Sequence, residues 1–572
     1  MATARPDRYQ SLLQQVYDVD TAARLTEALC RRVAGAPEIA GTGGEALTER
    51  DVVLITYAHT LLSPGKKPLE TLADFYRRHL GDLISIVHLL PFYPDTSDDG
   101  FSVVDYRAVR ADLGDWDDIG RLAGQARLMF DAVINHVSQQ SAWFQGYLAG
   151  DGAYRDYFLA VDPTTDLSAV VRPRPQPVLA EFRAADGAAR HIWATFSRDQ
   201  LDLNYANPRV LLEIIDVLIA YLARGAKVLR LDAVAFLWKE IGTSCIHLTQ
   251  THALIKLMRA VLEDIAPQVL IITETNVPHD ENVSYFGDGT DEAHMVYNFA
   301  LPPLVAHSLL SGDATRLSAW ATSLKTPGER ACYFNFTASH DGVGLRAVEA
   351  ILPDGARQAL IDTAERHGGF VSYRARGDGT RSPYELNCSY GDLLSPPSDP
   401  DDVRAARLLA SQAIALAMPG VPAIYIHSLL GSRNDHQRVA ERGHNRAINR
   451  SQLAAASVEQ ALADKASYRA RVFDAIAAML RARQHCPAFH PHGPFQVVDL
   501  DPRVFAVRRH APDGGQTVLA LINVSPAKVI VAASGNGPAR DLLGGSTCER
   551  SAVALAPYGV VWLDQTDARG GS

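Results

Sequence analysis

The sequence has few of the features that mark secreted, metal-clustered or membrane-spanning proteins. Its six cysteines are scattered over 572 residues and form no CxxC or Cys/His spacing of the kind that binds a metal. We therefore expect free thiols in a reducing compartment. The N-terminal segment MATARPDRYQSLLQQ has no continuous apolar stretch, so we expect no signal peptide. No apolar run approaches the roughly 18 residues of a membrane helix, and the sequence predicts a cytoplasmic enzyme without a membrane partner.

A strong charge of either sign is also missing. The 55 basic and 65 acidic side chains leave a net charge of −10, which argues against nucleic acid or an anionic membrane as the main partner. Hydrophobic residues make up 47% of the chain and charged residues 21%, as in ordinary globular proteins. The composition therefore leaves a large enzyme with a small-molecule substrate as the main expectation.

The pattern of apolar runs predicts an α/β fold. Residues 1–50 have helical apolar spacing and form a predicted N-terminal extension, which ends in a Gly/Pro-containing loop over 36–51. Eight short apolar runs suited to buried parallel strands follow, with amphipathic stretches such as 208–225 and 251–267 between most of them. These runs lie at 52–58, 84–92, 128–136, 226–234, 268–275, 294–302, 332–341 and 423–431. Eight strands alternating with helices indicate a closed (β/α)₈ TIM barrel over 51–486.

Two of the predicted loops are much longer than ordinary strand-to-helix connections. The first covers about 137–207 and the second about 342–405, and both follow strands at the end of the barrel where active sites assemble. We expect these insertions to build the substrate pocket. After 487 the chain changes to short alternating strands separated by Gly, Pro and Asp, which predicts a C-terminal antiparallel β-domain over 487–572.

Acidic side chains close several of the predicted strands. Asp131, Asp232, Glu274 and Asp341 stand at or near strand ends, where a carboxylate can project into the mouth of a barrel. For one such residue a helix cap or a salt bridge is the ordinary explanation. Several on different strands of one barrel would repel one another, and that cost favours a catalytic function.

The motifs around these carboxylates resemble the α-amylase superfamily of glycoside hydrolases. Its four identifying regions occur in order as DAVINH (131–136), LRLDAV (229–234), ITET (272–275) and ASHDGVG (338–344). The resemblance implies that Asp232 is the nucleophile, Glu274 the acid/base and Asp341 the carboxylate that binds the sugar hydroxyls at C2 and C3. These roles imply a retaining mechanism, for which we expect the carboxyls of the nucleophile and the acid/base about 5–5.5 Å apart.

Three neighbours of the carboxylates have implied supporting roles. Arg230, two residues before Asp232 on the same strand face, would keep that carboxylate ionised and oriented. His136 and His340 would donate hydrogen bonds to sugar hydroxyls. A histidine is often structural, but both lie inside the motifs.

Further segments resemble the sucrose phosphorylase-like branch of the superfamily. They are LITYA (54–58), HLLPFYP (88–94), RPRP (172–175), GTSC (242–245), FALPPL (299–304), PGVPAIY (419–425) and NRAINR (445–450). This match implies that Asp98, Phe101, Gln200 and Arg446 line the donor glucose site. Asp98 and Arg446 would close its far end, so that one terminal glucosyl unit is bound and not a polymer.

The same match implies a phosphate site. Arg174 of RPRP corresponds to a phosphate contact, because an arginine offers the two-pronged donor that a phosphate needs, and Tyr384 lies in the loop that completes the site. The alternative is that RPRP is a stiff loop whose arginines are solvated.

The acceptor loop RSPYE (381–385) departs from sucrose phosphorylases proper. Ser382 stands where those enzymes have an Asp for fructose, and Arg381 and Glu385 lie beside it. A lost carboxylate and a nearby arginine suit an anionic acceptor, and the pattern is most similar to the glucosylglycerate phosphorylases. It implies that 2-O-α-D-glucosylglycerate and phosphate give α-D-glucose 1-phosphate and D-glycerate through a glucosyl ester on Asp232.

Several alternatives stay open from the sequence. Arg381 could pair with a sugar phosphate, as in a sucrose or sucrose 6′-phosphate phosphorylase, or water or an alcohol could intercept the intermediate, as in an α-glucosidase or transglucosidase. A catalytically silent binding barrel is disfavoured because such relatives lose the carboxylates. In amylases the Asn of the DAVINH-type region helps to hold Ca²⁺, but beside Asn135 no cluster of oxygen ligands is visible. We expect no metal and no organic cofactor, and the oligomeric state is left open.

Overall fold

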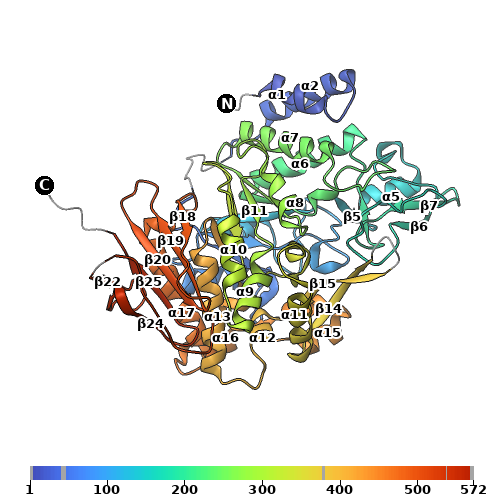
Figure 1. Cartoon of the computed structure of the whole chain (residues 1–572). Helices are drawn as coiled ribbons and strands as arrows, with labels where there is room; N and C mark the ends of the chain where they lie inside the picture. The colour runs from blue at the N-terminus through green and yellow to red at the C-terminus, as the bar shows by residue number, and fades with distance from the viewer. Residues whose placement is uncertain (1–3, 40–46, 376–379, 536, 567–572) are drawn as a thin grey trace.

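The computed structural model describes residues 4–39, 47–375, 380–535 and 537–566 (Figure 1). Eight parallel strands close into a barrel. Around the barrel the order is β1, β16, β12, β11, β10, β9, β4 and β3. The bounds are β1 Val53–Thr56, β3 Ile86–Leu89, β4 Arg127–Ala132, β9 Ala226–Leu231, β10 Leu270–Thr273, β11 Met295–Tyr297, β12 Cys332–Asn335 and β16 Val421–Tyr425. The predicted fold class is confirmed. Each strand lies in or overlaps one predicted apolar run, and most runs continue into the loop beyond the strand.

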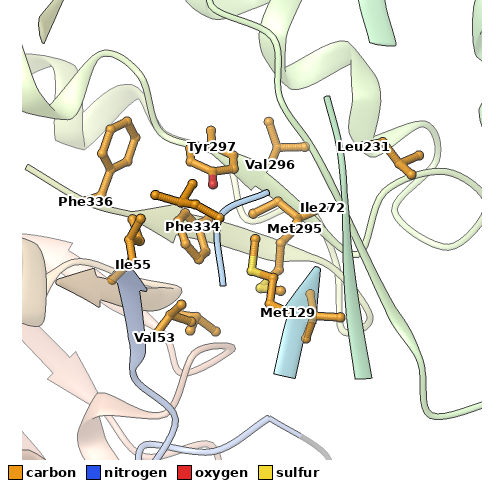
Figure 2. Close-up of a cluster of buried hydrophobic side chains, with 14 of the residues drawn as sticks. Val53, Ile55, Met129, Leu231, Ile272, Met295, Val296, Tyr297, Phe334 and Phe336 are labelled. Atoms are coloured by element: carbon orange, nitrogen blue, oxygen red, sulfur yellow. The ribbon is translucent and has the colours of Figure 1, made fainter. Parts of the chain in front are cut away.

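The barrel interior explains why these strands read as continuous apolar runs. Parallel strands covered by helices are buried on both faces, and all residues of β1, β3 and β16 are buried. Figure 2 shows Val53 and Ile55 of β1 in one apolar cluster with Met129 of β4, Met295 of β11 and Phe334 of β12. This core holds the strand ends, and with them the predicted catalytic residues, in a fixed ring.

Helices surround the barrel. Among them are α3 Pro68–His79, α4 Trp116–Ala123, α6 Pro208–Ala223, α7 Thr249–Ile265, α9 Leu301–Ser311, α10 Thr315–Ser323, α13 Asp401–Ala417 and α17 Tyr468–Gln484. Helix α6 illustrates how the sequence starts them: Pro208 occupies the first turn, and the Asn207 side chain accepts a hydrogen bond from the Arg209 N–H. Among the described residues, no helix is long and apolar enough to cross a membrane.

The N-terminal extension is a pair of helices, α1 Pro6–Leu13 and α2 Val19–Gly35, that lies against α6 and α7 (Figure 1). The Tyr9 hydroxyl donates to Asp264, and Arg32 forms a two-pronged ion pair with Asp216. Part of the predicted loop after these helices, residues 40–46, lies outside the described residues.

Both long loops carry their own short strands. Residues 137–207 contain α5 Ala142–Ala149 and the pair β6 Leu179–Arg183 and β7 Ala189–Trp193, while β8 Gln200–Asp202 pairs with β5 His136–Ser138. The segment 342–405 contains β13 Val343–Gly344, α11 Asp354–Arg366, β14 Phe370–Ala375, β15 Arg381–Asn387 and α12 Tyr390–Leu394. Residues 376–379 of this segment lie outside the described residues.

The C-terminal region is antiparallel, as predicted. Its main sheet has the order β18 Phe495–Val497, β19 Val504–His510, β20 Thr517–Asn523 and β25 Val560–Asp564. Arg509 of β19 donates to the carbonyls of Ala417 and Met418 at the end of α13, which joins the sheet to the barrel. Residues 536 and 567–572 of the predicted domain lie outside the described residues.

Candidate active site

A pocket at the carboxyl ends of the barrel strands collects most of the predicted site residues. Asp232 directly follows β9 and Glu274 directly follows β10. Their backbone N–H groups continue the barrel ladder, from Asp232 to the Ala132 carbonyl and from Glu274 to the Leu231 carbonyl, both at 3.1 Å. Twelve of the fifteen predicted residues line this pocket. They are Asp98, Phe101, His136, Arg174, Gln200, Arg230, Asp232, Glu274, His340, Asp341, Tyr384 and Arg446, joined by Phe196 and Ala233.

Arg230 is the partner of the predicted nucleophile. Its Nη1 donates to Asp232 Oδ1 at 2.8 Å and also pairs with Asp131, which in turn is bonded to His88 at 2.8 Å. Arg230 and Asp131 are fully buried, and Asp131 does not line the pocket. Asp131, the one predicted strand-end carboxylate that lies outside the pocket, therefore holds Arg230 in position.

The two central carboxyls compete for one proton. Burial raises the pKa of Glu274 to about 7, and the nearby Asp232 acts in the same direction while Arg230 opposes it. Burial also raises the pKa of Asp232 to about 7, again against Arg230. Because Arg230 bonds directly to Asp232, we assign the negative charge to Asp232 and the proton to Glu274.

The residue after the predicted nucleophile links the two carboxyls. Ala233 has a left-handed backbone with φ of 51°, which is uncommon for a residue other than glycine. Its N–H donates to Glu274 Oε2 at 3.1 Å. The strained turn thus fixes Glu274 relative to Asp232, a kind of strain that occurs at functional sites.

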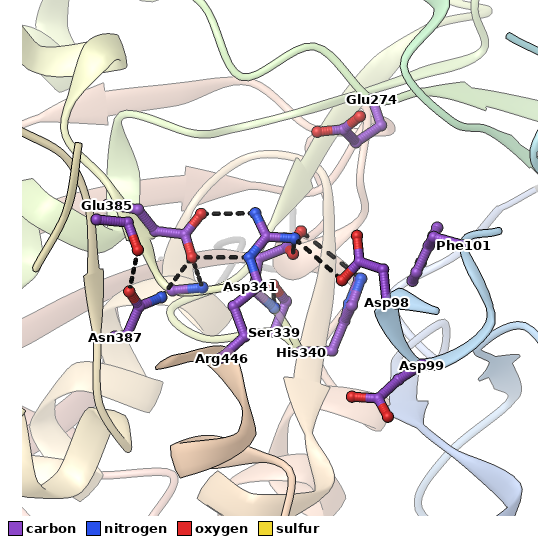
Figure 3. A network of polar contacts seen from close by, with 12 residues as sticks. Asp98, Asp99, Phe101, Glu274, Ser339, His340, Asp341, Glu385, Asn387 and Arg446 are labelled. Atoms are coloured by element: carbon purple, nitrogen blue, oxygen red, sulfur yellow. Dashed lines mark hydrogen bonds and ion pairs between the residues drawn. The ribbon is translucent and has the colours of Figure 1, made fainter. Parts of the chain in front are cut away.

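The predicted donor end of the pocket is built from paired charges (Figure 3). Arg446 contacts Asp341 at 2.6 Å and approaches Asp98 at 4.0 Å. Burial favours the neutral form of Asp341, but Arg446 and Arg450 outweigh it, and the pKa of this carboxyl lies below its ordinary value. Asp341 is therefore ionised and held in place before any sugar is bound.

Aromatic and amide groups form the other wall of this end. Phe101 stacks on His340, with ring centroids 4.9 Å apart. The Phe101 carbonyl contacts the His136 ring nitrogen at 2.9 Å and accepts from the Gln200 amide at 3.1 Å. Burial lowers the pKa of both histidines, so they are neutral and can exchange hydrogen bonds with sugar hydroxyls.

Sequence reasoning missed two supports of this end, Arg450 and Asp99. Arg450 is buried and donates to Asp99 at 2.7 Å and to the His340 carbonyl at 2.8 Å, and it thus links the loop after β3 to the fourth motif. Arg450 ends the quoted motif NRAINR, one turn after the predicted Arg446, and Asp99 directly follows the predicted Asp98. The sequence signal that could have found Arg450 is its position four residues after the predicted Arg446.

Only some of the residues predicted to bind phosphate and the acceptor line the pocket. Tyr384 lines the pocket, and the Arg174 guanidinium lies over its ring, 5.4 Å from the centroid. Arg381, Ser382 and Glu385 do not line the pocket: Arg381 is exposed at the start of β15, and Ser382 is buried with no partner for its hydroxyl among the described residues.

Glu385 has another partner. Its carboxylate accepts from Arg446 at 3.0 and 2.7 Å and from the Gly342 N–H at 3.0 Å (Figure 3). A bulge in β15 opposite Ser372 and Tyr373 leaves Tyr384 as the extra residue. Bulges re-aim side chains, which accounts for Tyr384 and its neighbour Glu385 both reaching the site.

A lysine binds the side-chain oxygens of Asn135, the motif residue that helps to hold Ca²⁺ in amylases, and of Asp202. The Lys239 ammonium contacts Asn135 Oδ1 at 2.9 Å and Asp202 Oδ2 at 2.8 Å, and all three side chains are buried. No group of three or more His, Cys, Asp or Glu side chains placed to hold a metal is found within the described ranges. A structural cation at this place would have to displace a buried lysine.

Together, the barrel and its three carboxylates define an enzyme class that transfers glycosyl groups with retention. Residues 76–341 match the family model of the α-amylase catalytic domain. The chain is 45% identical to a glucosylglycerate phosphorylase of Spirochaeta thermophila, over 97% of this chain and 98% of the relative. A glucosylglycerate phosphorylase of Escherichia coli is 47% identical over 90% and 92%, and a sucrose phosphorylase of Agrobacterium vitis is 32% identical over 79% and 91%.

A solved structure agrees with these relatives. The sucrose 6F-phosphate phosphorylase from Thermoanaerobacter thermosaccharolyticum superimposes with a TM-score of 0.74, at 22% identity, over 89% of this chain and all of that one. The chain therefore belongs to the α-amylase family, in the branch that contains the glucosylglycerate and sucrose phosphorylases.

Proposed function

We propose that this chain is a retaining glycoside phosphorylase that converts 2-O-α-D-glucosylglycerate and inorganic phosphate to α-D-glucose 1-phosphate and D-glycerate. Three glucosylglycerate phosphorylases are 45–47% identical to it over at least 90% of its length. The observation that carries the proposal is that Arg174 lines the same pocket as Asp232 and Glu274. Among the described residues its guanidinium has no carboxylate partner, which leaves it free for a phosphate.

The first half-reaction uses the two central carboxyls. The ionised Asp232 attacks the anomeric carbon and forms a β-glucosyl ester, while protonated Glu274 gives its proton to the glycosidic oxygen and glycerate leaves. The raised pKa of Glu274 keeps that proton available near neutral pH.

The second half-reaction reverses the roles. A phosphate oxygen attacks the anomeric carbon, the bond to Asp232 breaks, and Glu274 takes a proton from the entering phosphate. Two inversions give the α-configured product. Arg174 and Tyr384 are our proposed phosphate contacts, because they lie together on the wall of the pocket.

The donor end explains why a single glucosyl unit is taken. Asp98, Asp341 and Arg446 form a charged cluster there (Figure 3). A polymer chain would have to pass through these ion pairs, so we infer that the site ends after one sugar. A cytoplasmic location is part of the proposal and is supported by the six cysteines, all of which are free.

The test is an assay of purified protein with glucosylglycerate, glucosylglycerol, sucrose and sucrose 6′-phosphate, each with and without phosphate. We expect α-glucose 1-phosphate from glucosylglycerate, and little turnover without phosphate. Formation of glucose 1-phosphate from sucrose but not from glucosylglycerate would contradict the proposal. Equal rates with and without phosphate would instead indicate a hydrolase.

A further inference from the structure

Arg346 is a buried arginine that has no partner among the residues described by the structure. It begins the short helix η6 (Arg346–Val348), two residues after β13, and only 7% of its surface is exposed. Within the described parts of the chain, its guanidinium forms no hydrogen bond and no ion pair, and its Nε is shielded from solvent. Such a group is costly to bury unless something pairs with it.

Comparison with the other buried arginines shows how unusual this is. Every other arginine that is buried in the described residues donates hydrogen bonds to carboxylates or carbonyls. These are Arg230, Arg259, Arg404, Arg450, Arg483 and Arg509. Each of these guanidiniums therefore has at least one partner, although five of them also keep one shielded nitrogen without a hydrogen bond. Arg346 is the exception that has no partner at all among the described residues, and it calls for a ligand.

The acidic side chains near Arg346 are already in use. The charges that act on it include those of Glu349 and Glu281. Glu349 accepts from Arg374 at 3.1 Å, and Glu281 contacts the His247 ring nitrogen at 3.1 Å. Burial and the nearby Arg374 lower the pKa of Arg346, as expected for a cation without its own anion. Positive charge therefore remains uncompensated at this point.

Arg346 does not itself line the pocket, but the backbone places it next to the acceptor side. The N–H of the preceding residue, Leu345, donates to the Tyr384 carbonyl at 3.0 Å. Gly344 lies so close to Asn276 that a Cβ there would be 2.6 Å from the amide nitrogen. Asn276 follows Glu274 by two residues, and Glu274 is the group that protonates the departing oxygen. The segment before Arg346 therefore touches both Tyr384 and the strand end that carries the acid/base.

The side-chain oxygen of Asn276 is a hydrogen-bond acceptor without a donor among the described residues, and it complements the donor groups of Arg346. Its Oδ1 is shielded and accepts no hydrogen bond within the described residues. A guanidinium without an acceptor and an amide oxygen without a donor suit a small ligand that carries both an anionic group and a hydroxyl. Glycerate, the leaving group of the proposed reaction, has both.

We propose that Arg346 binds the anionic group of the acceptor, which is the glycerate carboxylate in the proposed reaction, with the Asn276 amide accepting from an acceptor hydroxyl. This inference rests on the proposed function and adds a specificity residue to it. It leaves Arg174 for phosphate, so that separate arginines serve the two anions.

The experiment compares the wild type with Arg346→Gln in the direction of synthesis, with α-glucose 1-phosphate as donor and glycerate or glycerol as acceptor. We expect the KM for glycerate to rise roughly 30-fold or more, the effect of losing a charged hydrogen bond, while the use of glycerol changes little. The preference for glycerate over glycerol should therefore collapse. Arg346→Lys keeps the charge and should restore part of the preference.

Exchange of labelled phosphate into α-glucose 1-phosphate, without any acceptor, reports folding and the donor half-reaction separately. We expect Arg346→Gln to keep this exchange. Arg381→Gln is the matched control, since Arg381 is an exposed arginine of the acceptor loop whereas Arg346 is buried, and it should lose much less of the preference. An unchanged preference in Arg346→Gln, or an equal loss of phosphate exchange, would overturn the inference.

A failure of the proposed function gives a different result. A wild type that ignores glycerate but uses fructose 6-phosphate contradicts the proposed function alone. The role of Arg346 is then read from the preference for fructose 6-phosphate over fructose, which Arg346→Gln should again abolish. If that preference survives as well, both proposals fail.

Discussion

The donor end and the acceptor side of the pocket differ in whether their arginines are paired with carboxylates. At the donor end every cation has an anion: Arg230 is paired with Asp232, and Arg446 with Asp341 and Glu385. On the acceptor side Arg174 only lies over an aromatic ring, and Arg346 has no partner among the described residues. The pocket thus has one wall with balanced charges and, on the acceptor side, a wall to which Arg174 gives surplus positive charge. Arg346 adds positive charge next to that wall without lining it.

The difference matches what each end would bind in the proposed reaction. Glucose is neutral, so a balanced set of charges orients its hydroxyls without attracting ions. The acceptor side must release one anion and admit another in every cycle. An arginine already paired with a carboxylate would have to break that pair each time, whereas unpaired arginines hold a positive potential that either anion can use.

Glu274→Gln should have the largest effect, because Glu274 lies where the two ends meet. Glutamine cannot donate the proton that the departing oxygen needs, so we expect glucosylglycerate cleavage to fall by roughly 10²- to 10⁴-fold. α-Glucosyl fluoride, whose leaving group needs no proton, should still form the ester. Measuring both substrates with purified variant protein checks this. Equal loss on both substrates would contradict the role of Glu274 as acid.

The pH profile adds a second readout to the same variant. Burial raises the pKa of Glu274 to about 7, and the first step needs its protonated form. The wild-type kcat/KM for glucosylglycerate should therefore decline as the pH rises above about 7. In Glu274→Gln this alkaline decline should be absent.

Arg174→Gln tests the acceptor side and should have a smaller effect on turnover than Glu274→Gln. If Arg174 pairs with phosphate, its loss should raise the KM for phosphate by roughly 10- to 100-fold and increase the share of hydrolysis. Since Arg174 has no ion pair to break in the described part of the chain, the melting temperature should hardly change. A steady-state titration of phosphate with a thermal melt measures both. An unchanged KM would favour the reading of RPRP as a stiff loop with solvated arginines.

The fold was predictable because its signals are local. Each barrel strand is a short apolar run that burial on both faces requires, and the motif carboxylates follow such runs directly, as Asp232 follows β9. The runs overestimated strand length, since hydrophobic loop residues such as Phe336 continue to pack after β12 ends. The site residues at strand ends were predictable for the same reason, and the pocket contains Asp232, Glu274 and Asp341.

The acceptor side was less predictable because its geometry depends on contacts between distant segments. The bulge in β15 determines that Tyr384 faces the pocket, and Glu385 gains its partner Arg446 from 61 residues further along the chain. Arg346 has no distinguishing sequence environment, and only its lack of a partner within the described ranges marks it. Motif spacing carries none of this information.

Glu385→Gln should have the smallest effect on turnover and a clear effect on stability, which is the reverse of Arg174→Gln. The neutral glutamine keeps the size of the side chain but leaves Arg446 with one full carboxylate partner, Asp341. We expect a change of only a few-fold in the KM for glucosylglycerate. Weakening a buried pair should still lower the melting temperature by roughly 2 to 6 °C.

The pH dependence of that stability identifies its cause. Burial favours the neutral form of Glu385, but Arg446 outweighs it and holds the pKa of this carboxyl below its ordinary value of 4.5. A carboxyl with a lowered pKa stabilises the folded state above that ordinary value, and the contribution is lost as the pH falls through the lowered pKa. The stability difference between wild type and Glu385→Gln should therefore be full at pH 7 and shrink in acid. A difference that stays constant on acidification would show that packing, and not the ion pair with Arg446, explains the loss, and the donor end would then be less dependent on paired charge than we infer.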